Sequence, residues 1–358
     1  MIFDEVDPEV ERCKRGARLI RNCVIGSLFA ALLFCAVRKS CGETPQQSGP
    51  QGIPPTGAEI ELGRKLFFEP LLSVDGTVSC ASCHNPSKGW ADGLPLAVGI
   101  NGQVGTRHSP TIINASYSPL MFWDGRTVAP ITQALLPLSN PIEMGQQSED
   151  DVVRKLRLLP EYVADFAKVY GIDAQSLSPV TGVRLARAIA AFETTVVSFN
   201  APIDRRLDGD ETALTPDAEI GFQLFRQANC MSCHTPPLFT DNLMHNNGME
   251  YAGKFAVSDL GRAGILPQNQ RTALTIRAFK TPHLREIHRT APYNHAGNFA
   301  DLDRVILHYA TGGARFDDTF DRFIDPRVRA IRTLEWTAEQ RGYLRTFLLE
   351  AFKGSPSP

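Results

Sequence analysis

The sequence lacks any strong excess of charge of either sign. Its 358 residues include 37 lysines and arginines against 39 aspartates and glutamates, a formal net charge of −2. This balance gives no indication that nucleic acid or another polyanion is a partner. Regular alternation of apolar and polar residues, the pattern of half-buried strands, is also missing, so the chain is predicted to be mainly α-helical. A soft prior of ~150 residues per domain suggests about two domains.

The chain also has no uninterrupted apolar run of ~20 residues, the length that a membrane-spanning helix needs. The stretch from Cys23 to Val37 is shorter and follows five basic residues between Arg12 and Arg21. A basic flank before a short apolar segment is typical of a secretory signal, and an uncleaved anchor stays open as an alternative. We therefore expect residues 1–42 to be a signal or membrane anchor, residues 43–57 to be a linker, and the rest to be periplasmic without further membrane contact.

Outside the leader the chain has few cysteines, because four of its eight lie in the first 41 residues. The other four form two C-x-x-C pairs, each followed directly by a histidine, and none is left over for a disulfide framework. The residues are Cys80, Cys83 and His84 in the first motif and Cys230, Cys233 and His234 in the second. In C-x-x-C-H the thiols attach to haem vinyl groups and the imidazole supplies the proximal iron ligand. A zinc site built from two pairs does not explain the histidines, so two covalent haem c groups are predicted.

Each haem motif follows a short amphipathic segment with helical periodicity, residues 58–68 before the first and 215–228 before the second. Further helical periodicity occurs in residues 148–170, 180–199, 302–309 and 337–352. Residues 86–114 and 235–280 are rich in Gly, Pro and Asn, and we expect them to be long loops around the haem edges. The predicted fold is mainly α, with two cytochrome c-like haem domains, residues 58–210 and 211–358, and long irregular loops.

Five short segments together carry a likeness to a known family. They are residues 122–126 (Phe-Trp-Asp-Gly-Arg), 133–134 (Gln-Ala), 140–145 (Asn-Pro-Ile-Glu-Met-Gly), 191–193 (Ala-Phe-Glu) and 291–295 (Ala-Pro-Tyr-Asn-His). In combination they resemble the bacterial di-haem cytochrome c peroxidase and MauG family, from about Ala58 to Phe352. The resemblance implies that residues 58–210 are the peroxidatic haem domain, with His84 as proximal ligand. It also implies that residues 211–358 are the electron-transfer haem domain, with His234 in the same role.

The resemblance also assigns the pocket on the reactive side of the first haem. Trp123 matches the tryptophan between the two haems, and Gln133 and Glu143 match the distal amide and acid. Pro137 matches a distal proline of the MauG branch. Heterolysis of an O–O bond needs a group that takes a proton from the inner oxygen and delivers it to the leaving one. A carboxylate beside an open iron site can do this, so Glu143 is the predicted acid–base residue.

Two positions depart from the peroxidase pattern. Ile100 stands where typical peroxidases carry a removable histidine ligand, so one face of the first haem is expected to be open without reductive activation, with His108 as an alternative ligand. Tyr309 stands where peroxidases have methionine, and no methionine follows Met249. Tyrosine is the MauG-like arrangement, and a hard phenolate donor favours ferric over ferrous iron. The neighbouring His308 stays open as a competing ligand.

The resemblance raises calcium as a further cofactor. In the family the ion is held between the haems by carbonyls at positions that match Thr290 and Pro292, together with an asparagine side chain. His108 occupies the asparagine position, and imidazole is a poor ligand for a hard cation that prefers oxygen, so calcium stays an open question. His295 matches a residue near the propionates of the second haem.

The leading hypothesis is an exported di-haem cytochrome c peroxidase that reduces hydrogen peroxide at the first haem with electrons relayed from the second. A small redox protein is then the expected electron donor. A second hypothesis is MauG-like oxidation of a protein substrate, favoured by Ile100, Pro137 and Tyr309. A third is a non-catalytic di-haem electron carrier. Carriers normally close both axial faces of each iron, so an open face beside Gln133 and Glu143 argues against the third.

Overall fold

The computed structural model describes residues 54–173, 178–249, 259–313 and 323–356. The chain divides into two compact units, Met1–Gln46 and Gln47–Pro358, and all described residues belong to the second. The predicted signal or anchor, residues 1–42, lies outside the described residues, as does most of the predicted linker. Among the described helices, none is both long enough and apolar enough to cross a membrane.

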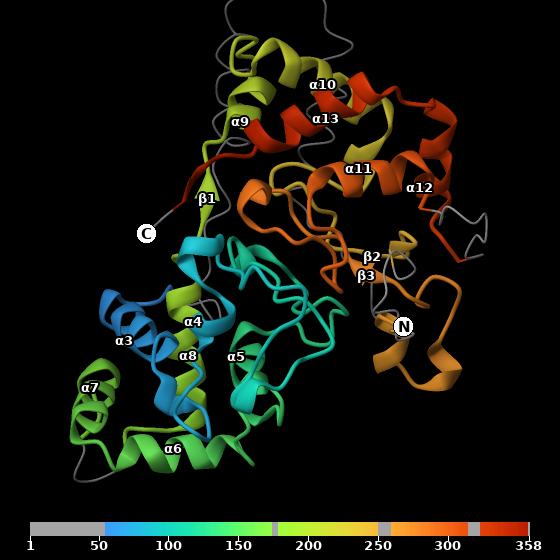
Figure 1. Cartoon of the computed structure of the whole chain (residues 1–358). Helices are drawn as coiled ribbons and strands as arrows, with labels where there is room; N and C mark the ends of the chain where they lie inside the picture. Colours follow the sequence, from blue (N-terminus) through green and yellow to red (C-terminus); the bar gives the residue numbers. More distant parts are fainter. Residues whose placement is uncertain (1–53, 174–177, 250–258, 314–322, 357–358) are drawn as a thin grey trace, which may run out of the picture. The chain divides into compact units, whose positions relative to one another are not determined.

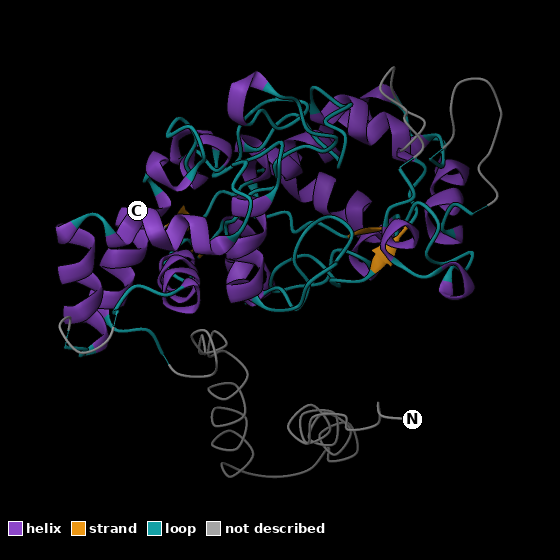
Figure 2. Ribbon diagram, turned by 90° about the horizontal axis from the view of Figure 1, so that it is seen from below, coloured by secondary structure: helices purple, strands orange, loops and turns teal. Residues whose placement is uncertain are grey.

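Helices and loops make up nearly all of the described chain (Figures 1 and 2). The α-helices are α3 (Gly57–Phe67), α4 (Cys80–Cys83), α5 (Pro130–Ser139), α6 (Glu149–Arg157), α7 (Pro160–Tyr170), α8 (Gly182–Glu193), α9 (Pro202–Leu207), α10 (Pro216–Gln227), α11 (Leu302–Ala310), α12 (Pro326–Ile331) and α13 (Ala338–Glu350). The strands are β1 (Ser198–Phe199), β2 (Met244–His245), β3 (Phe279–Lys280) and β4 (Ser355–Pro356). They form two antiparallel pairs, β1 with β4 and β2 with β3. The prediction of a mainly α fold is confirmed.

Side-chain caps define where the helices before the haem motifs begin. The hydroxyl of Thr56 accepts a hydrogen bond of 3.1 Å from the backbone N–H of Glu59 at the start of α3. Thr215 does the same at the start of α10, where Pro216 occupies the first turn. A threonine cap satisfies an N–H that has no partner within the helix, and proline suits the first turn because it lacks that N–H. The two helices therefore start with the same local device.

Close helix pairs organise both halves of the unit. α3 packs against α8, and α10 packs against α13. A glycine allows each close approach, because a Cβ atom on Gly63 would lie 1.8 Å from the carbonyl oxygen of Ala188. A Cβ atom on Gly221 would likewise lie 2.1 Å from the carbonyl oxygen of Tyr343. The helix that leads to each haem motif is thus fixed to its partner in the same way.

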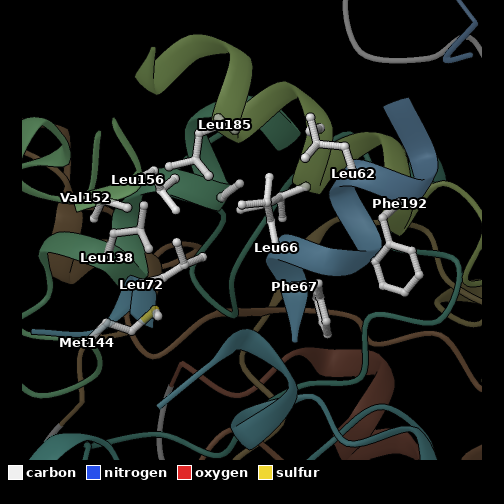
Figure 3. Close-up of a cluster of buried hydrophobic side chains, with 14 of the residues drawn as sticks. Leu62, Leu66, Phe67, Leu72, Leu138, Met144, Val152, Leu156, Leu185 and Phe192 are labelled. Atoms are coloured by element: carbon white, nitrogen blue, oxygen red, sulfur yellow. The ribbon is translucent and has the colours of Figure 1, made fainter. Parts of the chain in front are cut away.

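Two hydrophobic clusters form the core. The first runs from Leu62 to Val196, and Figure 3 shows side chains from α3, α5, α6 and α8 gathered within it. The second runs from Ala201 to Phe352. Cys80 packs against the first cluster and Cys230 against the second, so each haem motif lies on a core of its own. The division into two haem domains at residue 210 stays a prediction.

The two segments that the sequence predicts to be loops lack α-helix in their described parts. In their described parts, residues 86–114 and 235–280 contain no α-helix, only short 3-10 turns and the two-residue strands β2 and β3. They also connect the two halves, since the guanidinium group of Arg107 bonds to the carboxylates of Asp124 and Asp259 at 2.6 and 2.8 Å. These loops carry several of the predicted site residues.

Candidate haem sites

The first haem motif lies on one helical turn. α4 begins at Cys80 and ends at Cys83, and the backbone N–H of His84 donates to the carbonyl of Cys80 over 2.9 Å. The ring atom Nδ1 of His84 lies 3.3 Å from the carbonyl oxygen of Trp90. Because a carbonyl only accepts, Nδ1 carries the proton and Nε2 keeps its lone pair for a metal. Burial lowers the pKa of His84, which keeps the ring neutral.

The second motif repeats this arrangement on the 3-10 turn η6 (Cys230–Ser232). The backbone N–H of His234 donates to the carbonyl of Cys230 over 2.9 Å. Its Nδ1 lies 2.9 Å from the carbonyl oxygen of Phe239, which again fixes the proton on Nδ1 and leaves Nε2 free. Burial lowers the pKa of His234 as well. Both histidines are therefore oriented and neutral, as proximal ligands must be.

The four cysteines of the motifs fit haem attachment better than zinc binding. All four are free thiols, and burial raises the pKa of Cys80 and of Cys230 to about 12. Within the described residues, one group of three side chains could hold a metal ion, namely Cys233, Asp241 and His245. It contains a single cysteine, so the two pairs do not converge on one zinc ion. Two separate motifs, each with unpaired sulfurs and a free Nε2, suit two haem c groups.

Glu143 is placed at the first motif. Its pKa is raised by burial, an effect that the charge of Arg126 and a hydrogen bond from Asn140 oppose. Nδ2 of Asn140 donates to Oε1 of Glu143 over 2.7 Å, while the backbone N–H of Ile142 donates to Oδ1 of Asn140. The second bond fixes which end of the amide faces the carboxylate. The negative charges of Asp92 and Glu143 add to burial in raising the pKa of the Cys83 thiol, so Glu143 lies near that sulfur.

Gln133 and Pro137 both lie on α5, in the segment that precedes Glu143. They are four residues apart, so they share one face of the helix. Both are half-buried, and Ala134 and Leu138 on the adjoining face belong to the first hydrophobic cluster. The helix is thus fixed by its apolar side.

Ile100 is buried in the hydrophobic core. Its side chain is 5% exposed and belongs to the first hydrophobic cluster. Its backbone N–H donates to the carbonyl of Glu143 over 3.1 Å. A Cβ atom on Gly145 would lie 2.2 Å from Cδ1 of Ile100, so glycine is needed there. The loop around Ile100 is therefore fastened to the segment that carries Glu143.

Trp123 is held by residues from both halves of the unit. Its Nε1 donates to the carbonyl of His108 over 2.9 Å, and its own carbonyl accepts from the backbone N–H of Lys280 over 2.8 Å. Its ring meets His295 edge-to-face with centroids 6.5 Å apart. His295 in turn stacks on Phe279 at 3.6 Å. Both predicted residues therefore belong to one aromatic array where the halves meet.

His108 does not suit the calcium site that the family resemblance raised. Nδ1 of His108 donates to the carbonyl of Leu94 over 2.7 Å, and burial lowers the pKa of this imidazole. Calcium prefers six to eight oxygen ligands, and His108 offers nitrogen in place of an amide oxygen. His108 therefore does not fit the asparagine position of a calcium site, and the carbonyls of Thr290 and Pro292 remain predicted ligands.

Tyr309 and His308 have different surroundings although they are adjacent on α11. The hydroxyl oxygen of Tyr309 accepts from Nδ2 of Asn247 over 3.2 Å. Burial and the nearby thiols of Cys230 and Cys233 raise the pKa of Tyr309 to about 12, against the hydrogen bond from Asn247. Nε2 of His308 instead donates to the backbone carbonyl of Asn247 over 2.8 Å. Tyr309 is therefore the one whose charge interactions reach the second motif.

A charged cluster beside the second motif was missed from the sequence. Nε2 of His245 lies 2.8 Å from Asp241, and its Nδ1 lies 3.0 Å from Asp325, which also pairs with Arg327. Burial alone would lower the pKa of His245, but hydrogen bonds with Cys233 and Asp241 outweigh it and raise this pKa to about 9. The Asp325 side of the cluster is 80 residues away along the chain, so spacing gave no signal. Asn247 was missed for the same reason, because its partners Tyr309 and His308 are 62 and 61 residues away. Asn140 is only three residues from Glu143, but its residue type gave no signal of that contact.

Two haem-attachment motifs, each on its own helical core, define a di-haem c-type cytochrome, and the half-buried Glu143 adds an acid whose charge reaches the first motif. The sequence profile of the di-haem cytochrome c peroxidase family matches residues 57–212. The methylamine utilization protein MauG of Methylorubrum extorquens is 40% identical over 267 residues, which cover 74% of this chain and 72% of that protein. The cytochrome c551 peroxidase of Nitrosomonas europaea is 33% identical over 281 residues, 78% of this chain and 81% of that protein.

A solved structure gives the same result for the fold. The crystal structure of a MauG-like protein associated with microbial copper homeostasis aligns with a TM-score of 0.73 and 26% identity, covering 87% of this chain and 95% of that one. The chain belongs to the di-haem cytochrome c peroxidase family, as the five segments predicted. It is a peroxidase-type oxidoreductase with two haem c groups.

Proposed function

We propose that the protein is an exported peroxidase that reduces hydrogen peroxide at the haem of His84 with electrons relayed from the haem of His234. A small redox protein in the periplasm supplies those electrons. The observation that carries the proposal is Glu143, a half-buried acid whose charge reaches Cys83 and whose Oε1 is held by Asn140. Peroxide cleavage is aided by such an acid on the open face of the haem, opposite the proximal imidazole of His84.

The two carboxylate oxygens of Glu143 have different roles in proton transfer. Haem, when bound, supplies the iron chemistry that cleaves the O–O bond and the route by which electrons arrive. Because Asn140 occupies Oε1 of Glu143, Oε2 is left to accept the proton from the inner oxygen of peroxide. The same oxygen then returns the proton to the outer oxygen, which leaves as water. Two electrons and two protons in total convert each peroxide to two waters.

Three further residues support the proposal that one face of the first haem is open to peroxide. Ile100 offers no ligand atom and is packed into the core. Gln133 would offer its amide to peroxide, and Pro137 lies on the same face of α5. An accessible iron face without a histidine that must first leave is the arrangement that favours reaction in the diferric protein.

Tyr309 would be the other protein ligand of the second haem, and Trp123 would carry electrons between the two haems. The position of Tyr309 near Cys230 and Cys233 supports this assignment over His308. The contacts of Trp123 with His108 and Lys280 support the relay, because they hold the indole between residues of the two halves.

A second function is MauG-like oxidation of a protein substrate, which Ile100, Pro137 and Tyr309 favour. The relative from Methylorubrum extorquens carries the MauG name, and the chain is also similar to proteins named peroxidases. The non-catalytic carrier is disfavoured, because the half-buried acid Glu143 has no use in a carrier.

Rapid mixing of the diferric haem-loaded protein with hydrogen peroxide tests the proposal. Glu143→Gln should slow the change in the first haem's absorbance by ~10²–10⁴-fold, the usual contribution of a general acid–base residue. Haem content and the spectrum of the second haem should not change. Glu161→Gln, a surface glutamate in the first turn of α7, serves as the matched control and should react at the normal rate. A Glu143→Gln variant that reacts as fast as this control would exclude Glu143 as the acid–base residue.

Addition of a reduced small cytochrome then separates the two enzymatic functions. Rapid oxidation of that cytochrome by peroxide supports the peroxidase. A reaction that consumes peroxide but leaves the cytochrome reduced supports oxidation of a protein substrate instead.

A further inference from the structure

Asn247 contacts both candidate ligands of the second haem. The residue follows β2, and the two partners are neighbours on α11, about sixty positions later in the chain. Its side-chain Nδ2 donates to the hydroxyl oxygen of Tyr309 over 3.2 Å. Its backbone carbonyl accepts from Nε2 of His308 over 2.8 Å. One residue therefore bonds to the oxygen of one candidate and the ring nitrogen of the other.

The orientation of the Asn247 amide is fixed independently of Tyr309. The backbone N–H of Met249 donates to Oδ1 of Asn247 over 3.2 Å. Because an N–H needs an acceptor, the oxygen end of the amide must face Met249, and the NH₂ end is left to face Tyr309. The tyrosine oxygen thus meets a donor and not a second acceptor.

Backbone packing presses the Asn247 segment against the end of α11. A Cβ atom on Gly313 would lie 2.6 Å from the carbonyl oxygen of Asn247, and a Cβ atom on Gly248 would lie 2.2 Å from the carbonyl oxygen of Gly313. Both glycines have positive φ, 73° and 74°. The backbone N–H of Gly313 in turn donates to the carbonyl of His308 over 3.0 Å. These contacts leave the carbonyl of Asn247 little freedom to move away from His308.

The two hydrogen bonds of Asn247 have different effects on Tyr309 and His308. Neighbours on an α-helix point ~100° apart, so only one of them faces a given haem. The bond to Asn247 engages Nε2 of His308 as a donor, which removes its lone pair from metal binding. His308 is 7% exposed, and its ring packs against that of Phe299 at a tilt of 53°, which stabilises its position. The tyrosine oxygen accepts the bond from Asn247 and keeps a second lone pair that can bind a metal.

We propose that Asn247 is the positioning residue of the second haem: its carbonyl keeps His308 off the iron, and its amide directs and tunes the oxygen of Tyr309. The inference rests on the proposed ligation by Tyr309. A hydrogen bond to the ligand oxygen withdraws electron density from it, so Asn247 weakens the phenolate as a donor and eases reduction of the second haem.

Substitutions at three positions in the haem-loaded protein test this role. The readouts are the electronic absorption and EPR spectra of the second haem and its reduction equilibrium with a reference dye. Asn247→Asp keeps the shape and the acceptor for Met249 but replaces the donor by an oxygen, and Asn247→Leu removes both. Each should shift the reduction equilibrium about tenfold towards the ferric form, since a hydrogen bond to a charged acceptor is worth at least that factor. His308→Phe is the control and should leave the spectra as they are.

The results distinguish a failure of the role of Asn247 from a failure of ligation by Tyr309. If Tyr309→Phe leaves the second haem's spectrum unchanged, ligation by Tyr309 is wrong and the role of Asn247 fails with it. If Tyr309→Phe changes the spectrum but both Asn247 variants behave like the original protein, only the role of Asn247 is overturned. Both Asn247 variants keep the backbone carbonyl that engages Nε2 of His308, so neither should show a bis-histidine spectrum. A bis-histidine spectrum in either variant would overturn the role given to that carbonyl.

Discussion

Replacing Asn140 by aspartate should move the acid limb of the pH–rate profile to higher pH. Asn140→Asp keeps the Oδ1 acceptor for the backbone N–H of Ile142, so the local turn is preserved. It removes the 2.7 Å bond from Nδ2 to Oε1 of Glu143 and brings in a like charge. Burial already raises the pKa of Glu143, and the lost donor was one of two effects that opposed this rise. Both changes favour the protonated acid, so its pKa rises further.

The size of the effect follows from the bond that is lost. A hydrogen bond to a charged group contributes ~1.5–3 kcal/mol, which corresponds to a factor of ~10–100 in the ionised fraction of Glu143. Because the carboxylate must be ionised to accept the proton from peroxide, activity is lost as the pH falls through this pKa. On the acid limb, kcat/KM for hydrogen peroxide should therefore fall by that same factor, while the rate well above the limb changes little.

Steady-state assays across the acid range, with haem content measured for each preparation, give the result. In a Glu143→Gln background, Asn140→Asp should have almost no further effect, because the two residues act as one unit. An acid limb at the same pH in Asn140→Asp and in the unchanged protein would refute the role given to this bond.

Two further predictions concern the helix pairs and the indole. Gly63→Ala should destabilise the haem-loaded protein by about 3 kcal/mol, the upper end for overpacking, because the added Cβ meets the backbone of Ala188. Thermal unfolding measures the loss of stability. Gly57→Ala is the control and should change stability little, because the space around Gly57 is open. Trp123→Phe keeps a ring but loses the bond to the carbonyl of His108, so turnover with an electron donor should slow more than the reaction of the diferric protein with peroxide. Equal slowing of both reactions would argue against Trp123 as the relay.

The haem motifs and the family could be predicted from the sequence because their signals are local. Cys80, Cys83 and His84 carry their chemistry in five consecutive positions, and the second motif repeats it. The threonine before each leading helix is equally local. Glu143 and Tyr309 required the family likeness, because neither residue type nor spacing distinguishes them from surface residues. Their placement near Cys83 and near Cys230 supports that likeness.

The supporting residues could not be predicted because their partners are remote or generic. Asn140 lies three positions before Glu143, where asparagine is common in any turn, and its role depends on which end of the amide faces the acid. Asn247 meets α11 only in the folded chain. The strands β1 and β4 have two residues each, which is too few for an alternating pattern, and they pair from positions more than 150 residues apart. Each depends on tertiary contacts that a single sequence does not encode locally.

The burial of Ile100 has a consequence for control of the enzyme. The side chain of Ile100 fills the core and its backbone N–H bonds to the carbonyl of Glu143, which stabilises the loop in this position. Under the proposed assignment, the reactive iron has no built-in cap to lift, so no priming electron is needed before the first turnover. The turnover rate would then depend on the concentrations of peroxide and reductant and not on a conformational change at the first haem.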